Sequence, residues 1–547
     1  MRTCADLGIL GIVVPVLLAA PSSARSLPVG LMDRIPLDPT PQSLVYSGGK
    51  VPFPPAISVV GLDPADPGQE GTIETMRELL RLIPSDGGLG GGAAYRVEFR
   101  RSAAIAHPEG YALTSGPSGI EVEYATDTGQ FYGAQTVYQL LAYAGAGTRF
   151  LTYSEAPEEQ DAASRRYVPL VSIEDHPAYP VRSVMVDMGR APYSMALLKR
   201  LVRIMGQLKL NTLHLHLYDD QLCSFRFARL PIGHENPLAI DAADLAELVR
   251  YARIRHVSVM PELESWGHVR SIVYHYPELR GGPGMYGGAS LAMGEKTYAL
   301  LEQIYDEIVP CLEDQAAVHV GLDEAVWAVL PGEQNRDETP TRMVGRIHEA
   351  LMRVAARHNK RITMHLWADE GGRPVPDDIR GKVVVEPWKY LGADAPEIVR
   401  ALALYGGAGK PPFMMGAGAS SLAFHGTYEA TRVWCTEGAR YPNALGVTLC
   451  LWESNDLAGR LVTVYGGANF AWAAARARVM ANDPLGERLR YRTDRDLRSW
   501  QIIFPDADPA AIDADRGPEV KTGHYVWPPL AGRPVAPTMN VPVPPER

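Results

Sequence analysis

Cysteine is scarce in this sequence, with five residues in 547 and no CxxC pair among them. Their spacing does not demand disulfides and indicates neither a cysteine zinc site nor a dithiol redox centre. No Gly or Pro period is present that would indicate a fibrous chain. No Lys/Arg-rich stripe with interleaved aromatic residues occurs, and 53 basic against 63 acidic residues give a net charge of −10. Nucleic acid is therefore not an expected partner.

The chain also lacks an N-terminal segment long enough to span a membrane. Its first apolar run, residues 7–20, has 14 residues, fewer than the roughly 20 that cross a bilayer as a helix. Arg2 precedes the run, and the small residues Ser22, Ser23 and Ala24 follow it. This pattern predicts a signal peptide over residues 1–24 and an exported protein, periplasmic or secreted. A buried N-terminal helix is the alternative, but no polar face interrupts the run.

The length and the 46% hydrophobic content predict a globular protein of two domains. Residues 25–170 mix short alternating runs, at 95–100 and 119–125, with helical stretches at 72–83 and 133–142. This mixture is typical of a small α+β domain.

A different rhythm begins after residue 170, where apolar strand-length runs alternate with amphipathic helical stretches. Eight strands are predicted, at residues 182–187, 212–217, 258–262, 317–321, 362–367, 383–387, 413–416 and 446–452. Eight parallel strands close a (β/α)8 TIM barrel, which we expect over residues 171–480. A doubly wound open sheet is the alternative. Residues 481–547 are expected to form a helical segment and a Pro-rich tail.

Ionisable and aromatic side chains gather after the predicted strands, at the face where barrel enzymes place their active sites. Carboxylates together with tryptophans suggest a sugar site, because an indole stacks on a pyranose while carboxylates and arginine bind its hydroxyls. In strand order these residues are Arg190, His214, His216, Asp219, Asp220, Glu262, Glu264, His268, His319, Asp323, Glu324, Trp367, Glu386, Trp388, Trp452 and Glu453.

The adjacent acids Asp323 and Glu324 are the candidate catalytic pair. On an extended strand they would point in opposite directions, so both reach one substrate only at a strand end, where the pattern puts them. Two neighbouring carboxyl groups can be divided between an ionised role and a general-acid role, which suits glycosidic bond cleavage.

Several motifs, in order along the chain, resemble family 20 glycoside hydrolases, the β-N-acetylhexosaminidases. Residues 319–324 (HVGLDE) resemble the HxGGDE signature, residues 209–221 (KLNTLHLHLYDDQ) the KxNxxHxHxxDDQ stretch, residues 261–268 (PELESWGH) PExDxPGH, and residues 186–190 (VDMGR) DxxR. Residues 129–141 are similar to the end of the α+β domain that precedes the barrel in this family. The likeness covers about residues 40–475.

The resemblance implies a retaining reaction assisted by the substrate, whose 2-acetamido group is the nucleophile. Glu324 would be the acid and then the base, and Asp323 would orient the acetamido group. The resemblance further assigns substrate binding to Arg190, Asp219, Asp220, His268, Trp367, Trp388, Trp452 and Glu453, and supporting roles to His214, His216, Glu264 and His319. It implies no metal and no organic cofactor. The expected partner is a glycan with terminal N-acetylhexosamine.

The sequence departs from the family pattern at several positions. Leu322 replaces the second Gly of HxGGDE, Trp266 replaces the Pro of PExDxPGH, and Glu264 stands where Asp is frequent. The usual Tyr-x-Asp after the seventh strand is replaced by residues 416–425, which are more similar to the hexosaminidase D branch. The acetamide-binding tyrosine, and with it the preference between GlcNAc and GalNAc, is left unassigned.

Two other functions stay open. His214 and His216 lie on one face of a strand, and an HxH pair also begins the metal site of many barrel hydrolases. A non-catalytic carbohydrate-binding barrel would keep the tryptophans, but it would not need both Asp323 and Glu324. Glu262 and Glu386 could be ion pairs in the barrel interior rather than substrate contacts.

Overall fold

The computed structural model describes residues 37–82, 88–89, 95–146, 167–284, 288–331, 338–368, 375–391, 394–420, 427–455 and 457–474. The predicted signal peptide and the segment 481–547 lie outside the described residues, so both stay predictions. Among the helices described, none combines the length and apolar character of a membrane span. Cys223, Cys311, Cys435 and Cys450 are all described, and each is a free thiol.

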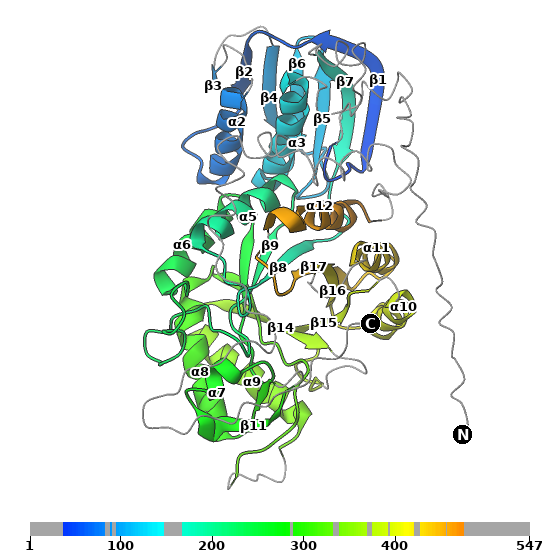
Figure 1. Cartoon of the computed structure of the whole chain (residues 1–547). Helices are drawn as coiled ribbons and strands as arrows, with labels where there is room; N and C mark the ends of the chain where they lie inside the picture. The colour runs from blue at the N-terminus through cyan, green and yellow to red at the C-terminus, as the bar shows by residue number, and fades with distance from the viewer. Residues whose placement is uncertain are drawn as a thin grey trace, which may run out of the picture.

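A seven-stranded mixed sheet forms the N-terminal part, drawn in blue to cyan in Figure 1. Its order is β1 (Ser43–Pro52), β7 (Tyr167–Asp175), β5 (Tyr111–Gly116), β6 (Gly119–Tyr124), β4 (Tyr95–Arg101), β2 (Ile57–Val60) and β3 (Gly88–Leu89). Helices α2 (Glu70–Leu82) and α3 (Asp127–Ala146) pack together, and α3 lies on β5, β6 and β7. Because β7 pairs with β1 and β5, this sheet continues to Asp175, past the expected boundary at residue 170.

Eight parallel strands close a barrel, which confirms the predicted fold class. They are β8 (Val181–Asp187), β9 (Thr212–His216), β10 (Ser258–Glu262), β13 (Gln315–His319), β14 (Arg361–Ala368), β15 (Val383–Lys389), β16 (Phe413–Ser420) and β17 (Ala444–Leu451). The pairing of β17 with β8 closes the sheet and rules out the open doubly wound alternative. Except for the surface ends of a few strands, the strand residues are buried, as expected for a sheet covered on both faces.

Helices surround the barrel as the predicted alternation requires (Figure 1). They are α5 (Met195–Gln207), α6 (Ala242–Arg253), α8 (Glu295–Ile308), α9 (Pro340–Arg357), α10 (Ala395–Tyr405), α11 (Thr427–Gly438) and α12 (Leu457–Ala473). Local chemistry fixes where they start: Asp241 and Asp244 form a capping box on α6, and Thr339 caps α9 with Pro340 in its first turn. Between β10 and α8 the chain adds α7 (Arg270–Val273) and the hairpin β11 (Arg280–Pro283)–β12 (Ala289–Leu291).

Buried charges join the N-terminal sheet to the barrel. Lys209, which precedes β9, donates to Asp175 Oδ2 at 2.9 Å and to the hydroxyl of Tyr111 at 2.7 Å. Trp472 of α12 donates to the other Asp175 oxygen at 2.8 Å. Burial lowers the pKa of Lys209, although Asp175 opposes this shift. The Lys209–Asp175 pair thus ties together the sheet, the barrel and α12.

Replacing Lys209 with alanine is expected to lower the free energy of unfolding by roughly 3–5 kcal/mol, because Asp175 then stays buried without its cation. Lys199→Ala is the matched control, since Lys199 pairs with Glu247 at 2.5 Å on the surface and such pairs contribute about 0–1 kcal/mol. Urea unfolding followed by circular dichroism measures both. Equal midpoints for the two variants would contradict the role of the buried pair.

Candidate active site

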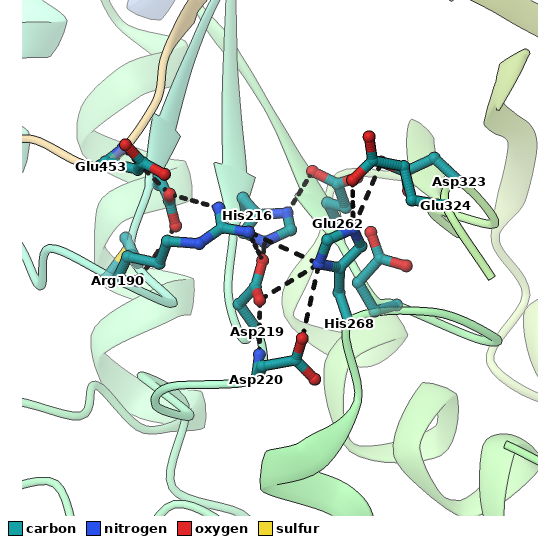
Figure 2. Close-up of polar contacts among 12 residues, drawn as sticks. Arg190, His216, Asp219, Asp220, Glu262, His268, Asp323, Glu324 and Glu453 are labelled. Atoms are coloured by element: carbon teal, nitrogen blue, oxygen red, sulfur yellow. Dashed lines mark hydrogen bonds and ion pairs between the residues drawn. The ribbon is translucent and has the colours of Figure 1, made fainter. Parts of the chain in front are cut away.

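The carboxyl ends of four neighbouring strands bring the expected polar residues together (Figure 2). β8 leads to Arg190, β9 to Asp219 and Asp220, β10 to Glu264 and His268, and β13 to Asp323 and Glu324. The two acids proposed for catalysis therefore lie beside side chains from three other strand ends. These residues are far apart in the sequence, and the direct pairing of β8 with β9, β9 with β10 and β10 with β13 makes them neighbours.

His268 connects the candidate catalytic pair to the rest of the cluster. Its Nε2 lies 3.4 Å from Glu324 Oε2 and 3.7 Å from Asp323 Oδ2. On the other side of the ring, Nδ1 lies 3.3 Å from Asp219 Oδ1. Burial alone would lower the pKa of His268, but the neighbouring acids Asp219, Glu324 and Asp323 together outweigh burial and hold this pKa well above its usual value. A protonated imidazole therefore faces Glu324 at neutral pH.

Arg190 forms the opposite end of the cluster, drawn at the left in Figure 2. Its guanidinium contacts Asp187 at 2.8 Å and Asp219 at 2.6 Å, and it lies over the Trp452 ring at 5.5 Å. Asp187 Oδ2 also accepts from the backbone N–H of Glu453 at 3.0 Å. Although burial opposes ionisation, Arg190 and His268 hold the pKa of Asp219 well below its ordinary value.

The three histidines expected to support the site meet on Glu262 inside the barrel. Glu262 oxygens lie 3.0 Å from His214, 2.7 Å from His216 and 3.1 Å from His319. Burial would raise the pKa of Glu262, but the imidazoles, His216 most strongly, hold it well below its usual value. A second interior acid, Glu386, lies 2.8 Å from His365. Both glutamates are thus paired with histidines inside the barrel. This agrees with the sequence interpretation that they are interior pairs rather than substrate contacts.

Tryptophans form an apolar cluster next to these polar residues. Trp367, Met185 and Cys450 are buried together, and Trp388, Trp452 and Tyr390 pack against them. The Trp367 and Trp452 rings are 6.2 Å apart, and Trp388 stacks on Tyr390 at 5.3 Å.

Tyr390 was not among the residues that the sequence pointed to. Burial raises its pKa well above the ordinary value, and the nearby charge of Asp323 adds to this effect. Its hydroxyl accepts a hydrogen bond from the Trp452 indole and donates one to the Cys450 thiol. The signal was available, because Tyr390 follows Trp388 by two residues and therefore shares its face of the chain. Part of the replaced segment 416–425, residues 421–425, lies outside the described residues.

Unusual backbone conformations let Asp323 and Glu324 reach the same imidazole. β13 ends at His319, two residues earlier than expected, and the chain then turns through positive φ at Gly321 (65°), Leu322 (84°) and Glu324 (46°). His268 (51°) and Glu453 (58°) are also left-handed. Non-glycine residues adopt this region at an energetic cost, and such strain is concentrated at functional sites.

Three groups of side chains have ligand atoms close enough together for a metal ion: His214, Glu262 and His319; His216, Glu262 and Glu264; and Asp219, Asp220 and His268. They are the candidate ligands for the metal-dependent alternative. Their principal acids already have partners within the protein, since Glu262 contacts three imidazoles and Asp219 contacts Arg190.

Family models match most of this region. The model described as glycosyl hydrolase family 20, catalytic domain, matches residues 179–401, and the family 20 domain 2 model matches residues 34–176. Together they cover more than half of the chain.

Named relatives and solved structures agree with these models. The chain is 27% identical over 237 residues to a Beta-hexosaminidase of Porphyromonas gingivalis, covering 40% of this chain and 29% of that one. It is 30% identical over 258 residues to the Chitooligosaccharidolytic beta-N-acetylglucosaminidase of Ostrinia furnacalis, covering 42% and 39%. The matches thus span less than half the length of either relative. The fold is similar to Flavobacterium johnsoniae chitobiase (TM-score 0.65, 19% identity, covering 85% and 72%) and to Streptomyces plicatus N-acetyl-beta-hexosaminidase (0.61, 21%, covering 84% and 95%).

Gly321→Ala is expected to destabilise the protein by roughly 2–5 kcal/mol, because φ is +65° and a Cβ would lie 2.0 Å from Glu264 Oε2. Gly381→Ala is the control, since no atom lies within 4 Å of its added Cβ. Thermal unfolding of the two variants measures the difference. A Gly321→Ala variant as stable as Gly381→Ala would show that the turn before Asp323 tolerates a side chain.

Proposed function

The chain belongs to glycosyl hydrolase family 20, and we propose that it removes terminal β-linked N-acetylhexosamine, GlcNAc or GalNAc, from glycans by a retaining, substrate-assisted reaction. The observation that carries this proposal is the placement of Asp323 and Glu324. Both carboxyl groups lie within 4 Å of the same His268 nitrogen, and Asp323 acts electrostatically on Tyr390 of the tryptophan cluster. The same proposal includes export of the protein, as the N-terminal sequence suggests, so that it cleaves glycans after export.

In the first step the carbonyl oxygen of the substrate's acetamido group attacks the anomeric carbon. Glu324 transfers its proton to the glycosidic oxygen as the bond to the leaving group breaks. Asp323 accepts a hydrogen bond from the acetamido N–H and stabilises the positive charge that develops on the resulting oxazolinium ring. In the second step Glu324, now ionised, takes a proton from water, which opens the ring and restores the β-linked hydroxyl.

The remaining side chains suit the binding of an N-acetylated sugar. The apolar walls of Trp367, Trp388 and Trp452 fit the acetamido methyl group and one face of the pyranose. Arg190, held by two carboxylates, presents its fixed charge for ring hydroxyls, and Glu453 is the neighbouring acceptor. His268 contacts Glu324 and is itself contacted by Asp219, and Asp220 lies beside them.

Hydrolysis of aryl β-N-acetylglucosaminide and β-N-acetylgalactosaminide is expected, with no cleavage of aryl β-glucoside, because only the acetamido sugars carry their own nucleophile. A thiazoline mimic of the intermediate should inhibit competitively, and EDTA should have no effect. Loss of activity with EDTA would favour a metal-dependent hydrolase. Sugar binding without cleavage of any substrate would favour a carbohydrate-binding barrel.

Glu324→Gln and Asp323→Asn are expected to differ in how they depend on the leaving group. Glu324→Gln should lower kcat by about 10²–10⁴-fold for a disaccharide but much less for a nitrophenyl glycoside, whose leaving group needs little protonation. Asp323→Asn should impair both substrates alike, because the acetamido nucleophile is misplaced whatever group leaves. Equal losses for Glu324→Gln on the two substrates, or full activity of Asp323→Asn on either, would refute the assigned roles.

A further inference from the structure

We propose that Glu264 is a protonated, neutral carboxylic acid at working pH and that it positions the ionised Asp323 beside it. This inference deepens the proposed function and depends on it for the role of Asp323. Within that function Glu264 is a positioning residue, because it acts on the acetamido group through Asp323.

The buried position of Glu264 favours an uncharged carboxyl group. Its side chain is buried, 1% exposed, between β10 and the turn that carries Asp323. One oxygen, Oε2, accepts a long 3.4 Å hydrogen bond from the backbone N–H of Leu322. The other, Oε1, has no hydrogen-bond partner among the described residues. An ionised carboxylate in such a place would be poorly solvated.

The surrounding charges argue in the same direction. In the described part of the chain, no Lys, Arg or His nitrogen forms an ion pair with Glu264, whereas Glu262 has three imidazoles and Asp219 has Arg190. Glu264 instead has an oxygen within 4.8 Å of an oxygen of Glu262. The nearest imidazole in that group, His216, is already shared by Glu262 and Asp219. A charge on Glu264 would therefore add a further anion next to Glu262 and Asp323.

The groups that act most strongly on Glu264 raise its pKa on balance. Burial raises its pKa most, the charges of Asp323 and then Glu262 raise it further, and His268 and His216 oppose them without reversing the shift. Tyr218 and Tyr305 also approach it and are neutral, because burial holds the pKa of each far above the physiological range. The geometry and the charges thus agree on a proton that stays on Glu264 at neutral pH.

The charge state of Glu264 affects the position of Asp323. Its O–H is a donor buried against the turn at Gly321, whose backbone approaches so closely that an added Cβ would lie 2.0 Å from Oε2. A neutral group in this place, unlike an anion, does not oppose the ionised form of Asp323, and its oxygen holds the backbone N–H of Leu322, the residue before Asp323. When rising pH removes the proton, two anions face each other and Asp323 is repelled from its place. Glu264 thereby supplies an upper pH limit to activity.

The test compares Glu264→Gln with Glu262→Gln, which make the same chemical change on the same strand end. An amide keeps a neutral donor at residue 264, so kcat should fall by less than about tenfold, and the alkaline decline of kcat should move to higher pH. At residue 262 the amide removes the anion that three histidines require, so both stability and activity should be lost. Glu264→Leu, similar in size but without a donor, should lower kcat by about 100-fold or more.

A loss of activity in Glu264→Gln as large as in Glu264→Leu, or an unchanged pH profile, would overturn the proposal. A second measurement does not depend on activity. The infrared difference spectrum between the wild-type protein and Glu264→Gln at neutral pH should contain the carbonyl band of a protonated carboxylic acid. Carboxylate bands in its place would refute a neutral Glu264 even if the hydrolase function holds, whereas failure on acetamido sugars with the acid band present would refute only the function.

Discussion

The contact between Glu262 and three imidazoles is the interaction on which the active-site end of the barrel depends. TIM barrels ordinarily fill their interior with layers of branched apolar side chains. Here a fully buried carboxylate lies at the end of β10 and binds His214, His216 and His319, which come from β9 and β13. Removing the acid would leave these buried rings without their partner, and removing the rings would leave a buried anion.

This pairing extends outward to the catalytic pair through shared partners. His216 contacts Glu262 with one nitrogen and Asp219 with the other, at 2.9 Å. Asp219 in turn contacts His268, which faces Glu324. Each group in the series is fixed by charge on two sides, so the position of Glu324 is set by contacts that begin inside the barrel (Figure 2). Such supported geometry is what general acid catalysis requires.

The sequence predicted the barrel well because its strands are short apolar runs that alternate with amphipathic helices, and each predicted barrel strand overlaps an observed one. It predicted less of the N-terminal sheet, where β1 contains Gly48, Gly49 and a register shift that hides the alternation. The site residues were found through motifs and strand ends. Their contacts were not, because the approach of Asp323 and Glu324 to His268 depends on left-handed turns that no periodicity reveals. Tyr390 was missed because it belongs to none of the motifs that pointed to the site.

Two of the strand ends at the site each carry a pair of carboxyl groups. In both pairs one group is held ionised while the pKa of the other is raised. After β9, Arg190 and His268 hold Asp219 ionised, whereas burial and the charge of Asp219 raise the pKa of Asp220. At β10, the imidazoles hold Glu262 ionised, whereas burial and Asp323 raise the pKa of Glu264. In each pair one carboxyl group is held ionised by its cationic neighbours, while burial and a neighbouring anion favour the protonated form of the other. The proposed substrate-assisted cleavage needs a similar division in the third pair, after β13, because Asp323 must orient the acetamido group as an anion while Glu324 delivers a proton.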